Sequence, residues 1–98
     1  MKLMTLIKEM LIPQKIDYSA MINKGAKVVD VRTQEEFISG HAKGSENIPL
    51  HELSNHIDKL KGQEVILVCR SGGRAAQAKS ILEKNNIISH NAGAWQNL

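Results

Sequence analysis

The chain of 98 residues has only one cysteine, Cys69, so it cannot form an intramolecular disulfide. The thiol is therefore a core group, a reactive site or an intermolecular link. The length suits one domain with one core, and a small α/β core of this size is stable without disulfides or structural metals. A lone free thiol is most compatible with a reducing compartment, so we expect a cytoplasmic protein. We also expect a monomer, and the sequence leaves the oligomeric state open.

Aromatic residues and long apolar runs are also scarce. The chain has one Phe, one Trp and one Tyr, which leaves little surface on which nucleic-acid bases could stack. Its net charge of +3 suits a small anionic substrate or an acidic partner, and we expect no nucleic-acid binding. No apolar stretch approaches the roughly 20 residues that cross a bilayer, so we also expect no membrane span.

Residues 1–13 are predicted to form a helical extension ahead of a domain over residues 14–98. Lys8 and Glu9 interrupt the apolar run of this segment and no small-residue cleavage site follows, unlike a signal peptide. We expect the helix to pack on the domain, and docking to a partner or a membrane surface is the alternative. Its apolar residues fall at helical spacing: Leu3, Leu6, Ile7, Met10 and Leu11.

Helices and strands are predicted to alternate along the rest of the chain. Thr33 and Glu36 have the spacing of a capping box, and Val65–Val68 is the strongest strand signal. The alternation predicts an α/β fold with a small, mostly parallel sheet flanked by helices on both faces. The expected elements are a helix from Asp17 to Gly25, a strand over 28–31, a helix from Thr33 to Gly40, a loop over 41–49, a helix over 50–62, a strand over 65–68, a helix from Ala75 that Asn85-Asn86 ends, and a short strand at Ile87-Ile88.

The segment from Cys69 to Arg74 carries the strongest indication of chemistry. It follows a buried strand directly, and ligands of open parallel α/β sheets bind beyond the carboxyl ends of the strands. The thiol would precede a helix N-terminus, with loop N–H groups turned inward and two arginines, Arg70 and Arg74, close by in sequence. Such surroundings lower a cysteine pKa from about 8.5 into a range of roughly 3.5 to 7.5.

The alternative is that Cys69 is an inert, buried residue at the end of a strand, which is the usual role of a lone cysteine. An inert cysteine does not require the Gly72-Gly73 pair or the two arginines that follow it. Glycine adopts positive φ at little cost and lets the backbone approach a bound group closely. We therefore favour a reactive Cys69.

Four segments of the chain follow a pattern that is known from one protein family. They are the loop Cys69–Ala75, Val29–Arg32 with Glu36-Phe37, Gly40-His41 through Asn47–Pro49, and, less closely, Asn91–Trp95. These motifs resemble those of the single-domain rhodaneses. Two positions depart from the family pattern: Ala42 stands where the family usually has a larger aliphatic residue, and Ala92 or Ala94 replaces a usual glycine. Both changes bear on local packing and on the shape of the pocket rim.

The resemblance implies a rhodanese-like fold and a double-displacement sulfurtransferase. The Cys69 thiolate would attack the outer sulfur of a small anionic donor such as thiosulfate and become a persulfide as sulfite leaves. Backbone N–H groups of Arg70 to Arg74 would stabilise the persulfide anion. Cyanide or a thiol, including one on a protein acceptor, would then remove the outer sulfur. The implied chemistry requires no metal and no cofactor.

Cys69 is thus the expected nucleophile, and its neighbours have supporting roles. Arg70 is the better candidate for binding the donor, because it begins the loop, whereas Arg74 begins the helix and could serve the structure; which of the two binds substrate stays open. The expected substrate-binding set is Arg70, Ser71, Gly72, Gly73 and Arg74, and the expected structural support is Asp30, Arg32 and His41, the last by family resemblance. The histidines have no metal-ligand spacing: His41, His51, His56 and His90.

Two other functions compete with sulfur transfer. Related phosphatases and arsenate reductases have one more residue between cysteine and arginine, which makes a wider cradle for a tetrahedral oxyanion. Four residues separate Cys69 from Arg74, so the smaller ring suits a single sulfur atom better. The third hypothesis is a docking module that uses the stripe of residues 3–11, with the loop as a relic.

Overall fold

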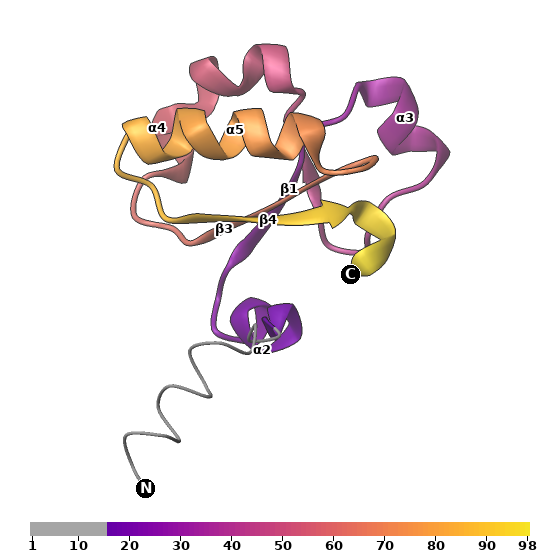
Figure 1. Cartoon of the computed structure of the whole chain (residues 1–98), viewed down its shortest axis with the longest axis horizontal. Helices are drawn as coiled ribbons and strands as arrows, with labels where there is room; N and C mark the ends of the chain where they lie inside the picture. The colour runs from indigo at the N-terminus through magenta and orange to yellow at the C-terminus, as the bar shows by residue number, and fades with distance from the viewer. Residues whose placement is uncertain (1–15) are drawn as a thin grey trace, which may run out of the picture.

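The computed structural model describes residues 16–98, which form a four-stranded sheet covered by helices (Figure 1). All neighbouring strands are parallel, in the order β2-β1-β3-β4. This confirms the predicted α/β fold with a parallel sheet. The strands are β1 (Lys27–Asp30), β2 (Glu46–Asn47), β3 (Val65–Cys69) and β4 (Ser89–Ala94).

Helices lie on both faces of the sheet, as expected (Figure 1). The short helix α2 (Tyr18–Asn23) covers one face. The opposite face carries the 3-10 helix η1 (Leu50–His56), α4 (Ile57–Leu60) and the longer α5 (Gly73–Lys84). Two further elements are α3 (Gln34–Ser39) and the 3-10 helix η2 (Trp95–Asn97). Within residues 16–98, no helix is long and apolar enough to cross a membrane.

The central strand β3 is buried on both faces and separates two hydrophobic clusters. Alternate side chains of a strand point to opposite faces, so Leu67 packs under α5 while Ile66 and Val68 face α2. Strands covered on both sides have continuous apolar runs, which is why Val65–Cys69 was recognisable from sequence. The end of this buried strand positions Cys69 beneath the first turn of α5.

Local capping signals behave as predicted. The Asp17 carboxylate accepts a hydrogen bond from the N–H of Ala20 at 3.0 Å and begins α2. Thr33 and Glu36 form the predicted capping box, since each side chain accepts from the other residue's backbone N–H. Gly40 ends α3, as expected. The predicted helices α2, α3 and α5 are therefore confirmed.

The prediction of one α-helix over residues 50–62 was wrong. The chain forms a 3-10 helix over Leu50–His56 and only one α-helical turn over Ile57–Leu60. A 3-10 helix has three residues per turn, so the three-residue step from Leu50 to Leu53 keeps both side chains on one side. Leu53 is fully buried and Leu50 packs against the same cluster. The apolar pattern therefore identified the buried face but not the type of helix.

The predicted strand at Ile87-Ile88 was also wrong. Ile87 is buried in the turn that follows α5, Ile88 is 65% exposed, and the strand begins after them at Ser89. Pairing with β3 outweighs the low strand propensity of the sequence Ser89–Ala94. The strand predicted over 28–31 ends at Asp30, and β2 lies inside the segment 41–49 that was expected to be a loop.

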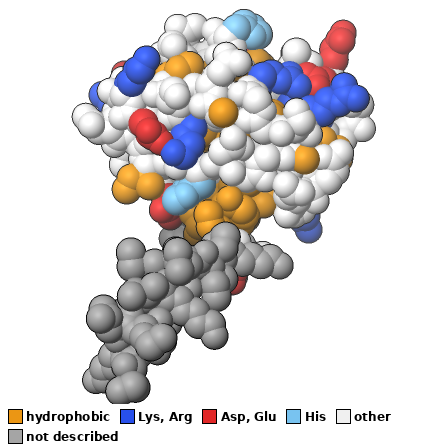
Figure 2. All heavy atoms as spheres, in the orientation of Figure 1, with side chains coloured by type: hydrophobic (Ala, Val, Ile, Leu, Met, Phe, Trp, Pro, Cys, Tyr) orange, Lys and Arg blue, Asp and Glu red, His pale blue; other side chains and the backbone are white. Residues whose placement is uncertain are grey.

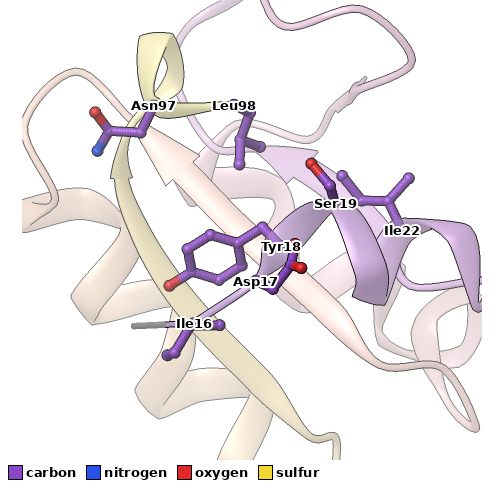
Figure 3. A pocket seen from close by; sticks show the side chains of 7 residues that line it. All are labelled: Ile16, Asp17, Tyr18, Ser19, Ile22, Asn97 and Leu98. Carbon is purple, nitrogen blue, oxygen red and sulfur yellow. The ribbon is translucent and has the colours of Figure 1, made fainter. Parts of the chain in front are cut away.

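The predicted helical extension over residues 1–13 lies outside the described residues. At the start of the described chain, a hollow of about 560 Å³ lies between α2 and the C-terminal residues (Figure 3). In space-filling view, hydrophobic side chains gather on the side of the sheet where α2 lies (Figure 2). No residue of the Cys69–Arg74 segment lines the hollow, whose walls are Ile16, Asp17, Tyr18, Ser19, Ile22, Asn97 and Leu98.

Candidate active site

The sulfur of Cys69 faces the backbone N–H groups of the loop that follows it. The N–H of Gly72 donates a hydrogen bond to Sγ across 2.9 Å. Burial is the largest single influence on the thiol and raises its pKa, but hydrogen bonds from the N–H groups of Ala75, Gly72, Ser71 and Arg74 together outweigh it. The pKa of Cys69 therefore lies below its ordinary value, and the site favours the thiolate.

Cys69 is more deeply buried than the sequence suggested, because only 1% of the residue is exposed. Its side chain belongs to the cluster under α5, as the inert-cysteine alternative expects. That alternative does not account for the N–H donors on Sγ, which lower the pKa and which an apolar pocket would lack. Arg70, Ser71 and Gly73 are exposed, so the sulfur lies beneath a loop that itself faces solvent.

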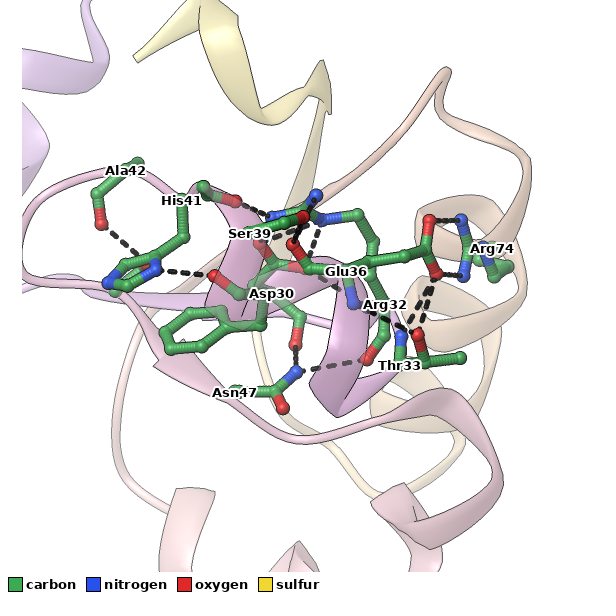
Figure 4. A network of polar contacts seen from close by, with 12 residues as sticks. Asp30, Arg32, Thr33, Glu36, Ser39, His41, Ala42, Asn47 and Arg74 are labelled. Atoms are coloured by element: carbon green, nitrogen blue, oxygen red, sulfur yellow. Dashed lines mark hydrogen bonds and ion pairs between the residues drawn. The ribbon is translucent and has the colours of Figure 1, made fainter.

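Arg74 is engaged by a carboxylate from α3 (Figure 4). Its two terminal nitrogens donate to the two oxygens of Glu36, at 2.7 and 3.0 Å. The hydrogen bonds from Arg74 hold the pKa of Glu36 at about 2, and Glu36 in turn raises the pKa of Arg74. Arg70, by contrast, is exposed, and no carboxylate within residues 16–98 pairs with it. These positions agree with the expectation that Arg70 binds the donor while Arg74 serves the structure, and both roles stay predictions.

Asp30 and Arg32 form a buried ion pair at the end of β1 (Figure 4). The exposed fractions are 0% for Asp30 and 4% for Arg32, and the closest contact, from Nη2 to Oδ2, is 2.8 Å. Arg32 also donates to the carbonyl of Gly40 at 2.6 Å and lies over the ring of Trp95, 5.0 Å from its centroid. Each of the three guanidinium nitrogens donates to at least one acceptor, and such pairing is the condition under which a buried ion pair is tolerated. The contacts suit the expected supporting role.

His41 is exposed and attached to α3 (Figure 4). Its ring stacks on Phe37 with centroids 3.7 Å apart, and Nδ1 lies 2.7 Å from the carbonyl oxygen of Phe37. Because a carbonyl only accepts, Nδ1 is the donor of this contact. These contacts suit a role in fixing the loop. Within the described part of the chain, His, Cys, Asp and Glu residues form no group of three that could hold a metal ion.

Two residues that contact the loop were not predicted from the sequence. Glu36 was recognised as a helix cap but not as the partner of Arg74. Asn91 was noted only within a weakly matching motif, yet its side chain donates to the carbonyl oxygen of Gly72 at 3.0 Å. Nothing in the sequence pairs Gly72 with Asn91, because the contact depends on the register of β4 against β3.

Comparison with known families identifies the family of the described domain. The family model of the Rhodanese-like domain matches residues 15–98, the whole described domain and one residue more. The chain belongs to the rhodanese-like family. Thiosulfate sulfurtransferase PspE of Escherichia coli is 32% identical over 74 residues, which cover 71% of each chain. The putative sulfur carrier protein YrkF of Bacillus subtilis is 32% identical over 72 residues, 72% of this chain and 37% of YrkF.

Solved structures agree with this assignment of the rhodanese-like chain. A rhodanese with anions from E. coli has a TM-score of 0.69 and 29% identity, covering 76% of this chain and 92% of that one. The chain spans less than half the length of the Bacillus subtilis relatives that it matches. The family and the fold are therefore established for residues 15–98, and sulfurtransferases are among the relatives at 32 to 34% identity.

Proposed function

We propose that this rhodanese-like chain is a sulfurtransferase in which Cys69 carries the transferred sulfur as a persulfide. The observation that carries the proposal is the set of backbone N–H groups around Sγ, which lower the pKa of the thiol. Only the thiolate is a strong sulfur nucleophile, so a lowered pKa makes it available at neutral pH. The same donors suit the negative charge of a persulfide.

The reaction is a double displacement. The thiolate of Cys69 attacks the outer sulfur of thiosulfate, a sulfur–sulfur bond forms at Sγ, and the original bond to the sulfonate sulfur breaks. The bonding electron pair leaves with sulfite, so the step needs no external oxidant. A nucleophile such as cyanide or a thiolate then attacks the outer sulfur of the persulfide, and Cys69 leaves as the thiolate.

Arg70 is the residue that we propose to attract the donor. It is exposed, follows the nucleophile directly and has no carboxylate partner within residues 16–98, unlike Arg74, which is paired with Glu36. A guanidinium binds a sulfonate well, because two of its N–H groups can donate to two oxygens of the anion. The E. coli rhodanese of similar structure was solved with anions, which supports an anionic donor.

The acceptor that we propose is a nucleophilic thiol or cyanide. A protein acceptor is a further candidate, because a relative at 32% identity is a putative sulfur carrier protein. We propose the cytoplasm as the site of the reaction, because a reducing compartment keeps a single thiol free for sulfur transfer.

Intact-mass measurement tests the proposal. The full chain is incubated with thiosulfate, freed of excess donor and weighed with and without reductant. We expect a gain of one sulfur atom that reductant or cyanide reverses. The variant Cys69→Ser should show no gain in mass. If the wild-type chain also shows no gain that reductant reverses, the proposal is contradicted.

A further inference from the structure

Gly72 is held by hydrogen bonds at both its N–H and its carbonyl oxygen. Its N–H donates to the sulfur of Cys69, and its carbonyl oxygen accepts from the N–H of Ala76 at 2.9 Å and from the side-chain amide of Asn91 at 3.0 Å. The N–H of Gly72 thus contacts the sulfur of Cys69, and the two bonds to its carbonyl oxygen hold the other side of the same residue. Asn91 is the only one of these partners that comes from outside the loop and α5.

An irregularity in β4 places Asn91 at the loop. In the pairing with β3, Leu67 lies opposite Asn91 but the next residue, Val68, lies opposite Gly93. Ala92 is the extra residue of this bulge and packs in the cluster on the α2 side. Asn91 keeps the register of Leu67, whose side chain faces α5, and so reaches the start of that helix.

The orientation of the Asn91 amide is defined by two hydrogen bonds. Oδ1 accepts from the N–H of Gly93 at 2.9 Å while Nδ2 donates to the carbonyl of Gly72. A flipped amide would place donor against donor and acceptor against acceptor, so both bonds support one orientation. The side chain therefore forms a rigid link between the bulge and the loop.

The two segments are also in close contact. A Cβ built on Gly72 would lie 3.6 Å from Cα of Gly93 and 3.8 Å from both polar atoms of the Asn91 amide. Gly72 itself has a φ of +102°, a conformation that glycine adopts readily and that residues with a side chain rarely adopt. The bulge therefore packs directly against the residue whose N–H meets Sγ.

We propose that Asn91 is a positioning residue for the nucleophile, acting through Gly72. By holding the Gly72 carbonyl, it keeps the N–H of the same residue directed at the sulfur of Cys69. The inference rests on the proposed role of Cys69 as the sulfur-carrying nucleophile. Loss of the Asn91 amide should therefore raise the pKa of the thiol, an effect that a purely structural role in the bulge would not produce.

Two variants separate positioning from bulge stability. Asn91→Ala removes both hydrogen bonds of the side chain. Asn91→Ser retains a hydroxyl that can accept from Gly93 two residues on, but is too short to reach Gly72. The control is Asn97→Ala, which removes another side-chain amide that donates to a β4 carbonyl, that of Ala92 at 2.8 Å, without contacting the loop.

The measurement is the pH dependence of the alkylation of Cys69 by iodoacetamide in the full chain, with folding checked by circular dichroism. We expect both Asn91 variants to raise the midpoint pH of alkylation. At pH values below that midpoint, alkylation should slow about threefold for each half unit of increase in pKa. Asn97→Ala should leave the midpoint unchanged. Because alkylation needs no sulfur donor, the result stands independently of whether thiosulfate loads Cys69.

An unchanged midpoint in folded Asn91→Ser would overturn the proposal, since the link to Gly72 would then have no effect on the thiol. If even Asn91→Ser fails to fold, Asn91 is required for folding, and this result would also overturn the proposal. A midpoint shift of equal size in Asn97→Ala would show that any weakening of β4 alters the thiol, which contradicts a specific role for Asn91.

Discussion

Arg74 and Glu36 meet through both of their terminal polar atoms, at 2.7 and 3.0 Å. Arg74 lies in the first turn of α5 and Glu36 in the first turn of α3, so the pair joins the two helices that flank the loop. Bidentate geometry fixes both the distance and the angle between the partners. One of the N–H groups near Sγ belongs to Arg74, so this pair also constrains the site.

Glu36→Gln should reduce stability in a pH-dependent way. Glutamine still accepts the capping hydrogen bond from Thr33, so the variant removes mainly the charge. The pKa of Glu36 falls from 4.5 to about 2, so its charge stabilises the fold fully above about pH 4.5 and loses this effect as the pH falls through about 2. We expect a deficit of about 1 kcal/mol or less at neutral pH, since the pair is half-exposed.

Urea denaturation of both proteins between pH 2 and 7 checks this expectation. Asp58→Asn is the control, because Asp58 is fully exposed and pairs with Lys61 across 3.6 Å. Its effect should be smaller than that of Glu36→Gln at pH 7. A deficit for Glu36→Gln that grows as the pH falls would contradict the assigned ion pair.

Gly72→Ala should impair both the fold and the reactivity of Cys69. Alanine at a φ of +102° costs about 1 to 2 kcal/mol in backbone strain. Gly25→Ala is a matched control, because Gly25 has a φ of +104° and a Cβ there would meet nothing within 4 Å. We expect similar losses in the free energy of unfolding, with slower alkylation of Cys69 only in Gly72→Ala. Equal alkylation rates in the two variants would argue against a role for the Gly72 geometry.

Asp30→Asn should be the most destabilising of these substitutions. It leaves the guanidinium of Arg32, which is 4% exposed, without its counter-charge. Breaking a buried pair from one side costs about 3 to 5 kcal/mol. Urea denaturation should show this loss, whereas Lys61→Ala, which breaks an exposed pair, should change stability by less than about 1 kcal/mol. Equal losses in the free energy of unfolding for the two variants would show that the buried Asp30–Arg32 pair contributes little to stability.

Arg70→Ala should weaken the use of thiosulfate without weakening the fold. Arg70 is exposed, so its loss should leave the free energy of unfolding within about 0.5 kcal/mol of the wild-type value. We expect a several-fold higher KM for thiosulfate and an unchanged pH midpoint of alkylation. Lys84→Ala removes the same charge at the far end of α5 and is the control for net charge. An equal KM in both variants would exclude donor binding by Arg70.

Much of the fold was predictable because its signals are local. The capping box of Thr33 and Glu36 depends on residues three apart, and the buried strand Val65–Cys69 follows from a continuous apolar run. The position of Cys69 at the end of that strand, before a helix, followed from the same pattern. These features need no knowledge of distant segments, which is why the sequence indicates them reliably.

The missed features depend on contacts between distant segments. The sequence Ser89–Ala94 has few residues that favour strands, and it becomes one because β3 offers a free edge. The bulge at Ala92 and the contact of Asn91 with Gly72 follow from that pairing. Glu36 lies 38 residues before Arg74, so their ion pair also required the fold. The depth of Cys69 was missed for the same reason, because the cluster that buries it is built from several elements that lie far apart in the sequence.

The guanidinium of Arg32 also bears on how the domain opens. It donates to Asp30 at the end of β1, to the carbonyl of Glu36 within α3 and to the carbonyl of Gly40 just after that helix. Local unfolding of α3 would deprive the buried guanidinium of these two carbonyl acceptors, even though Asp30 would still balance its charge. Opening of α3 therefore costs more than the loss of its own short helix, and its amide hydrogens should exchange more slowly than its length alone predicts.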